Sequence, residues 1–129
     1  FVIIPPAVKK EVLIESKEGY ISIYNAIKSG WINVIQPKSK IKLGLGEGEN
    51  QAISLAIERK DSIILDDAVA VKAAESFKVP VIRTTTVIFI ALRNKIISKD
   101  KAIAILNQLI EIGYYISTKE YAVLMSKLK

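Results

Sequence analysis

The stretch that decides the fold begins LGLGEGENQAI (residues 43–53) and ends SIILDD (residues 62–67). Its first part is a glycine-rich turn leading into a helix, because the apolar residues that follow recur at helical spacing. Its second part is a short apolar strand that ends in two carboxylates. In an open α/β sheet, ligands bind outside the carboxyl ends of the strands. We therefore expect Glu49, Asp66 and Asp67 to meet at that edge, where they would suit a hard divalent cation.

Short apolar runs alternate with helical segments on both sides of this stretch. We expect strands at residues 1–4, 31–35, 63–65 and 79–82, and helices from residue 6 and at 22–29, 47–60, 68–77, 84–93, 100–112 and 118–128. Asp100 and Thr118 are expected to cap the last two helices. This alternation implies βαβ crossovers, so the predicted class is α/β with a parallel sheet covered on both faces.

Composition limits the chemistry of the chain. Its 129 residues fit one domain with one core. Cysteine and histidine are both absent, which excludes thiol catalysis, disulfides and the usual zinc ligands. A catalytic acid or base must then be a carboxylate, a lysine, a tyrosine or a metal-bound water. The net charge of +6 favours a polyanionic partner through its summed field, although the lysines also serve to solubilise a very apolar chain.

The sequence favours a cytoplasmic protein. No uncharged run approaches the roughly 20 residues that span a bilayer, and no signal peptide is visible. Abundant isoleucine and lysine, with a single methionine, resemble the composition of thermophile proteins.

The closely spaced glycines do not form a nucleotide-binding loop. Counted from Gly44, a dinucleotide fingerprint needs glycine at position 49, which is Glu49. Counted from Gly46, it needs glycine at position 51, which is Gln51. No Gly-Lys-Ser/Thr follows, so a P-loop is excluded as well.

The acids also have purely structural explanations. Glu47 and Glu49 would complement the positive end of a helix macrodipole, and Asp66 or Asp67 would cap the helix after a strand. The combination favours a metal site, because a glycine-rich approach, an acid, one helix and a strand ending in paired aspartates occur in that order.

The chain resembles the PIN-domain superfamily, closest to a prokaryotic branch predicted to bind nucleic acid and related to VapC-type toxins. The resemblance rests on LGEGE (45–49) with AI (52–53) and LA (55–56), LDD (65–67) with KAA (72–74), IIPPAV (3–8) with Glu11, VPVI (79–82), and a tail with LI (109–110), Gly113 and IS (116–117). It spans essentially the whole chain.

The resemblance implies a three-layer α/β/α sandwich with a parallel sheet and extra C-terminal helices. It also implies an endoribonuclease that uses Mg²⁺ or Mn²⁺ held by carboxylates. Glu49 would be the helix-borne acid and Asp67 the principal strand-end acid, with Asp66 in support. This suits the chemistry, because Mg²⁺ takes oxygen ligands and keeps several waters.

Basic residues near the same edge are candidates for RNA contacts. Lys42, Lys72, Arg83 and Thr84 would hold RNA phosphates, each contact adding to a salt-dependent affinity. Lys38 and Lys40 belong to the same group. The alternative is that these lysines are ordinary solvated side chains that offset local acidic repulsion.

Two departures from the family bear on activity. The family's first strand is central in its sheet and carries an aspartate, which should lie upstream of Ile3 and is absent here. Residues 1–129 would then form a single PIN-like domain that is N-terminally incomplete; a strand from another chain and a rearranged sheet are the alternatives. Second, Arg83 and three threonines occupy the region where many PIN enzymes place a further acid.

We therefore predict a metal-dependent ribonuclease, plausible as the toxin of a toxin–antitoxin pair. Such toxins commonly form homodimers or higher homo-oligomers and are silenced by an antitoxin protein. The first rival is a degenerate PIN fold that binds RNA or protein without cutting. The second is a structural or regulatory oligomer subunit.

Overall fold

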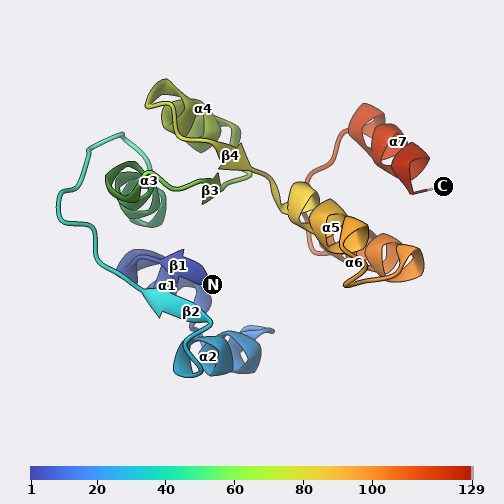
Figure 1. Ribbon diagram of the computed structural model, residues 1–129, viewed down its shortest axis with the longest axis horizontal. Helices are drawn as coiled ribbons and strands as arrows, with labels where there is room; N and C mark the ends of the chain where they lie inside the picture. Colours follow the sequence, from blue (N-terminus) through green and yellow to red (C-terminus); the bar gives the residue numbers. More distant parts are fainter. Residues whose placement is uncertain (129) are drawn as a thin grey trace. The chain divides into compact units, whose positions relative to one another are not determined.

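The structure is a computed structural model, and it describes residues 1–128. The elements follow one another in the order β1 (Val2–Ile4), α1 (Pro6–Val12), α2 (Tyr20–Lys28), β2 (Ile32–Val34), α3 (Glu47–Arg59), β3 (Ile63–Ile64), α4 (Ala68–Ser76), β4 (Val81–Ile82), α5 (Thr84–Arg93), α6 (Lys99–Glu111) and α7 (Thr118–Lys127). Figure 1 shows them along the chain. The mixed α/β class predicted from the sequence is confirmed.

The strands pair in parallel, as predicted, but they form two separate pairs. β1 pairs with β2, with Ile3 opposite Asn33, and β3 pairs with β4, with Ile63 opposite Val81. In residues 1–128 no ladder joins the two pairs into one sheet. The continuous sheet expected from the strand pattern is therefore not formed by these residues.

The chain divides into two compact units, one of residues 1–82 and a second from Arg83 onward. The core of the first unit is built on α3: Ile53 is fully buried and packs with Ala56, Ile63, Ala74 and Val79. These residues come from α3, β3, α4 and the approach to β4, so one helix organises the strand that carries the paired aspartates.

The second unit is a helical hairpin with a third helix. Leu106 is fully buried on α6, and it clusters with Ile88 of α5 and with Leu124 and Leu128 at the end of the chain. These are the extra C-terminal helices that the sequence predicts. None of the helices in residues 1–128 is long and apolar enough to span a membrane.

Two predicted helix caps are wrong by one or two residues. Ser98, not Asp100, caps α6, because its side chain accepts a hydrogen bond from the Lys101 N–H. Ser117, not Thr118, caps α7 in the same way. Serine is at least as good a cap as aspartate or threonine. Asp100 instead stands in the first turn of α6, where its charge still complements the helix dipole.

Candidate active site

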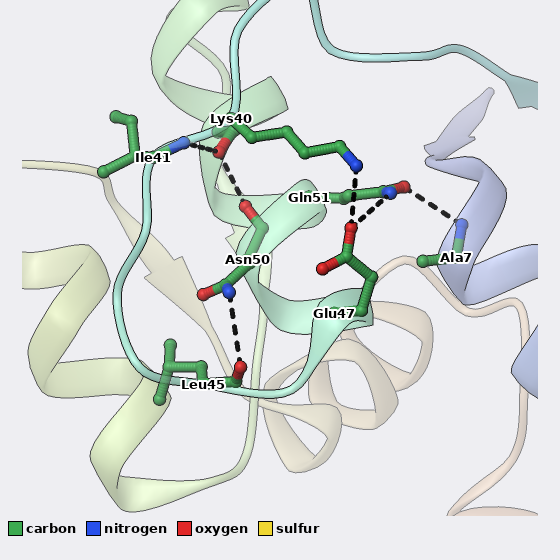
Figure 2. Close-up of polar contacts among 8 residues, drawn as sticks. Ala7, Lys40, Ile41, Leu45, Glu47, Asn50 and Gln51 are labelled. Atoms are coloured by element: carbon green, nitrogen blue, oxygen red, sulfur yellow. Dashed lines mark hydrogen bonds and ion pairs between the residues drawn. The ribbon is translucent and has the colours of Figure 1, made fainter.

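Glu47 and Glu49 stand in the first turn of α3, which begins after Gly46 without a side-chain cap. Figure 2 shows how Glu47 is held: its Oε1 lies 3.0 Å from Lys40 Nζ and accepts a hydrogen bond of 2.9 Å from Gln51 Nε2. These two contacts, that with Lys40 first, lower the pKa of Glu47 below its usual value. The structural explanation therefore holds for Glu47.

Glu49 lies in a different environment. Its side chain is half-buried, and burial is the main cause that raises the pKa of its carboxyl above the usual value. The negative charges of Asp67 and Glu11 raise that pKa further. Asp67 at the exit of β3 and Glu11 on α1 therefore lie within electrostatic range of the Glu49 carboxyl on α3.

Asp67 has a structural role as well as a place in this cluster. It is the N-cap residue of α4, and its Oδ2 accepts a hydrogen bond of 2.9 Å from the Ala70 N–H. Asp67 is exposed, and Asp66 before it is half-buried. Asp67 thus lies within electrostatic range of Glu49, while the metal-binding roles of Asp67 and Asp66 stay predictions.

Glu11 is the acid that the sequence prediction did not assign to the site. It lies near the end of α1 and rests on the first turn of α3, where a Cβ added to Gly48 would lie 2.5 Å from Glu11 Oε1. The glycine therefore lets the Glu11 carboxylate approach the helix. The sequence marked Glu11 as one of the residues on which the resemblance rests, but only the tertiary structure places its carboxylate against α3.

The chemistry of these side chains fits a hard cation better than their spacing does. Glu49, Asp67 and Glu11 all offer carboxylate oxygens, the ligands that Mg²⁺ and Mn²⁺ prefer, and a cation would relieve the repulsion that raises the pKa of Glu49. Within residues 1–128, however, no three acidic side chains lie close enough to hold one ion together. The donor set fits a divalent ion and is incomplete as it stands.

The basic segment 38–42 runs along α3. Ser39 N–H donates to Glu58 Oε1 at 2.8 Å, and Ile41 N–H donates to Ser54 Oγ at 3.0 Å. Figure 2 shows the second of these contacts. Because the segment is held in this way, Lys40 reaches Glu47 and partly offsets the acidic charge, as the solvated-lysine alternative expects.

The other predicted RNA-contacting residues lie in both units. Lys42 follows the held segment, and Lys72 is on α4; both side chains are exposed. Arg83 and Thr84 stand at the start of α5, in the second unit. Lys42 and Lys72 therefore share the first unit with the acids, and the RNA contacts of all four residues stay predictions.

A family model described as a PIN domain matches residues 1–129. No curated protein and no solved structure matches the chain.

Proposed function

The chain belongs to the PIN-domain family, and from this membership we propose that it is a metal-dependent endoribonuclease. Membership supports nuclease-type function in general. The observation that carries the finer proposal is the raised pKa of Glu49, which arises from burial and from the charges of Asp67 and Glu11. Carboxyls whose pKa is raised by burial and by neighbouring negative charges are typical of functional sites.

Glu49 and Asp67 would hold Mg²⁺ or Mn²⁺, with Asp66 and Glu11 in support. When bound, such an ion polarises a phosphate oxygen and makes a bound water more acidic. Glu49 must give up its proton to bind a cation, so its raised pKa makes metal affinity fall at acid pH. Asp67 is oriented by its hydrogen bond from the Ala70 N–H, and Lys42 and Lys72 would bind RNA phosphates.

A toxin role with an antitoxin partner, and assembly as a homodimer or higher homo-oligomer, belong to the same proposal. Support comes from apolar side chains that are exposed in the second unit: Val87, Ile90, Ile96, Ile110, Ile112, Tyr115 and Val123. Exposed apolar side chains that lie together mark protein interaction surfaces.

One observation favours a second candidate, a PIN fold that binds RNA or protein without cutting it. No three acids in residues 1–128 are placed to hold an ion together. A module that lost one ligand would keep the basic surface and the fold. This candidate and the structural or regulatory subunit both predict an absence of cleavage.

The test is cleavage of a structured RNA by the 129-residue chain in Mn²⁺ and in EDTA. We expect cleavage in Mn²⁺ and none in EDTA. The cleavage rate should fall by about 100-fold or more in Glu49→Gln and in Asp67→Asn, because the loss of even an outer partner of a metal ligand lowers activity about 10–100-fold. Glu75→Gln is the matched control, since Glu75 is an exposed acid on α4 away from the cluster.

Each other outcome has a definite meaning. Cleavage that survives both substitutions would contradict the proposed site. Salt-sensitive RNA binding without cleavage would favour the binding module, and a lack of both would favour the structural subunit.

A further inference from the structure

One face of α3 carries polar side chains that follow one another at intervals of three or four residues, the spacing at which side chains share a helix face. They are Glu47, Asn50, Ser54 and Glu58. All of them bind residues 38–45, which lie in the loop between β2 and α3 and are called the strap below. One helix face is thus used to hold one loop segment.

The strap runs antiparallel to α3, because contacts that come later in the strap lie earlier on the helix. Its hydrogen bonds join Ser39 to Glu58, Ile41 to Ser54, and Leu45 to Asn50. Figure 2 shows the contacts of Ile41 and Leu45. The strap is therefore held along its length and not only where it enters the helix.

Ser54 is the buried member of this helix face, with 1 % of its surface exposed. Its Oγ accepts a hydrogen bond of 3.0 Å from the Ile41 N–H and donates one of 2.7 Å to Asn50 O. A buried N–H that loses its acceptor is destabilised. The Ser54 hydroxyl therefore fixes the middle of the strap.

Exposure alternates along the strap from residue 40 to residue 45, with the period of two that is typical of extended backbone. The half-buried side chains are Ile41, Leu43 and Leu45, of which the two leucines pack on the core of the first unit. The exposed lysines are Lys38, Lys40 and Lys42. The strap thus has an apolar inner side and a basic outer side.

The basic side leads to the candidate active site. Lys40 pairs with Glu47 at 3.0 Å, and Glu49 stands in the same first turn of α3. Within residues 1–128, neither Lys38 nor Lys42 forms an ion pair. Two lysines on the same segment are therefore open to an anionic partner next to the acids.

We propose that Ser54 is a positioning residue for the RNA substrate. By binding the Ile41 N–H, it holds the strap on α3 before RNA arrives. Lys38 and Lys42 then contact phosphates of one RNA strand, which leads toward Glu49. A loose segment would lose conformational freedom on binding RNA, whereas a segment that is already held loses less. This inference rests on the proposed function and says how the chain positions its substrate.

The test measures the binding of a labelled structured RNA to the 129-residue chain by fluorescence anisotropy in EDTA, where metal-dependent cleavage does not interfere. We expect Ser54→Ala to weaken binding about fivefold, the effect of about one hydrogen bond. Ser76→Ala is the matched control, because Ser76 is an exposed serine on α4 whose hydroxyl donates to Ala73 O in its own helix. Circular dichroism checks that both variants fold.

A double variant decides whether Ser54 acts through the lysines. When Lys38→Gln and Lys42→Gln are both present, Ser54→Ala should change the affinity for RNA by less than about twofold, because residues that act through one interaction are not additive. A merely structural role of Ser54 would give the same fivefold loss with and without the lysines.

Glu58 gives a test in which folding is not at risk, since its side chain is exposed. Glu58→Ala and Glu58→Gln remove the same charge, but glutamine keeps an oxygen that accepts from the Ser39 N–H. Glu58→Ala should therefore bind RNA about two- to threefold more weakly than Glu58→Gln.

Three results would overturn this inference alone. They are equal RNA affinities of Ser54→Ala and the parent, an equal loss with and without the two lysines, and equal affinities of the two Glu58 variants. A parent chain that does not bind RNA would overturn the proposed function together with this inference. Loss of RNA cleavage in Glu49→Gln is a separate readout, because binding in EDTA involves no cleavage.

Discussion

At the residue scale, Glu49 is the side chain whose ionisation is disfavoured by the fold. Burial and the charges of Asp67 and Glu11 raise the pKa of its carboxyl above the usual value of 4.5. The native state therefore binds this proton more tightly than the unfolded state does. The contribution of the protonated Glu49 carboxyl to the free energy of unfolding is fully present below pH 4.5, and it is lost as the pH rises through the raised pKa. At neutral pH the charged form of Glu49 destabilises the fold.

The first prediction concerns this residue alone. Glu49→Gln removes the repulsion, so the variant should have a higher free energy of unfolding and a higher unfolding temperature than the parent at pH 7. The gain in free energy should be less than about 1 kcal/mol because the side chain is partly exposed. The difference should shrink below pH 4.5, where the parent carboxyl is protonated. Thermal denaturation across this pH range measures it, with Glu75→Gln as control. A difference that does not change with pH would contradict the prediction.

Mn²⁺ gives a second readout on the same pair of proteins. A ligand that binds only the native state raises the unfolding temperature. Mn²⁺ should therefore stabilise the parent more than Glu49→Gln. Equal stabilisation of both proteins would place the ion elsewhere.

At the scale of elements, Gln51 joins α1 to α3. α1 begins after Pro5 with no side-chain cap, so its first N–H groups lack acceptors. Gln51, only 6 % exposed, supplies one: its Oε1 accepts a hydrogen bond of 3.0 Å from the Ala7 N–H. Its Nε2 donates to Glu47, which binds Lys40, and Figure 2 shows this chain of contacts. One side chain thus holds α1, and with it Glu11, against α3.

We predict that Gln51→Ala lowers the free energy of unfolding by about 1–2 kcal/mol, since the Ala7 N–H loses its partner in a partly buried position. Urea denaturation measures the change. Gln108→Ala is the control, because Gln108 is an exposed glutamine on α6, and its effect should stay within about 0.5 kcal/mol. Equal effects of the two substitutions would show that the contact does not stabilise the unit.

At the scale of the whole molecule, the relevant property is the net charge of +6. Of the three lysines in segment 38–42, Lys40 is paired with Glu47, which leaves Lys38 and Lys42 as the better candidates for phosphate contacts. Lys72 is a further candidate on α4. Binding to RNA phosphates releases counterions, so affinity should fall steadily as salt rises.

We predict that Lys42→Gln and Lys72→Gln each weaken RNA binding across all sequences and each reduce the slope of log affinity against log salt by about one. Fluorescence anisotropy at several salt concentrations measures the slope. Lys17→Gln, an exposed lysine between α1 and α2, is the control. An unchanged slope in the first two variants would remove these lysines from the RNA surface.

The α/β class and most elements were predictable from the sequence. The run from Ile53 to Ala56 has helical spacing, Gly30 and Gly113 end their helices at positive φ, and Pro6 starts α1. These are local effects, in which a few neighbouring residues decide the backbone. The cap errors at Asp100 and Thr118 arose because several residues that favour caps stand side by side, and only the formed hydrogen bond selects one.

By itself, the sequence determined the parallel α/β pattern and the acids Glu49 and Asp67 at the ends of their elements. Only the tertiary structure decided that Glu11 joins them, that Gln51 ties α1 to α3, and that the strands form two pairs. The physical reason is the distance along the chain over which each kind of interaction acts. Helical periodicity and capping act over a few residues, whereas the packing of Glu11 on Gly48 and the pairing of strand edges join residues far apart in the chain.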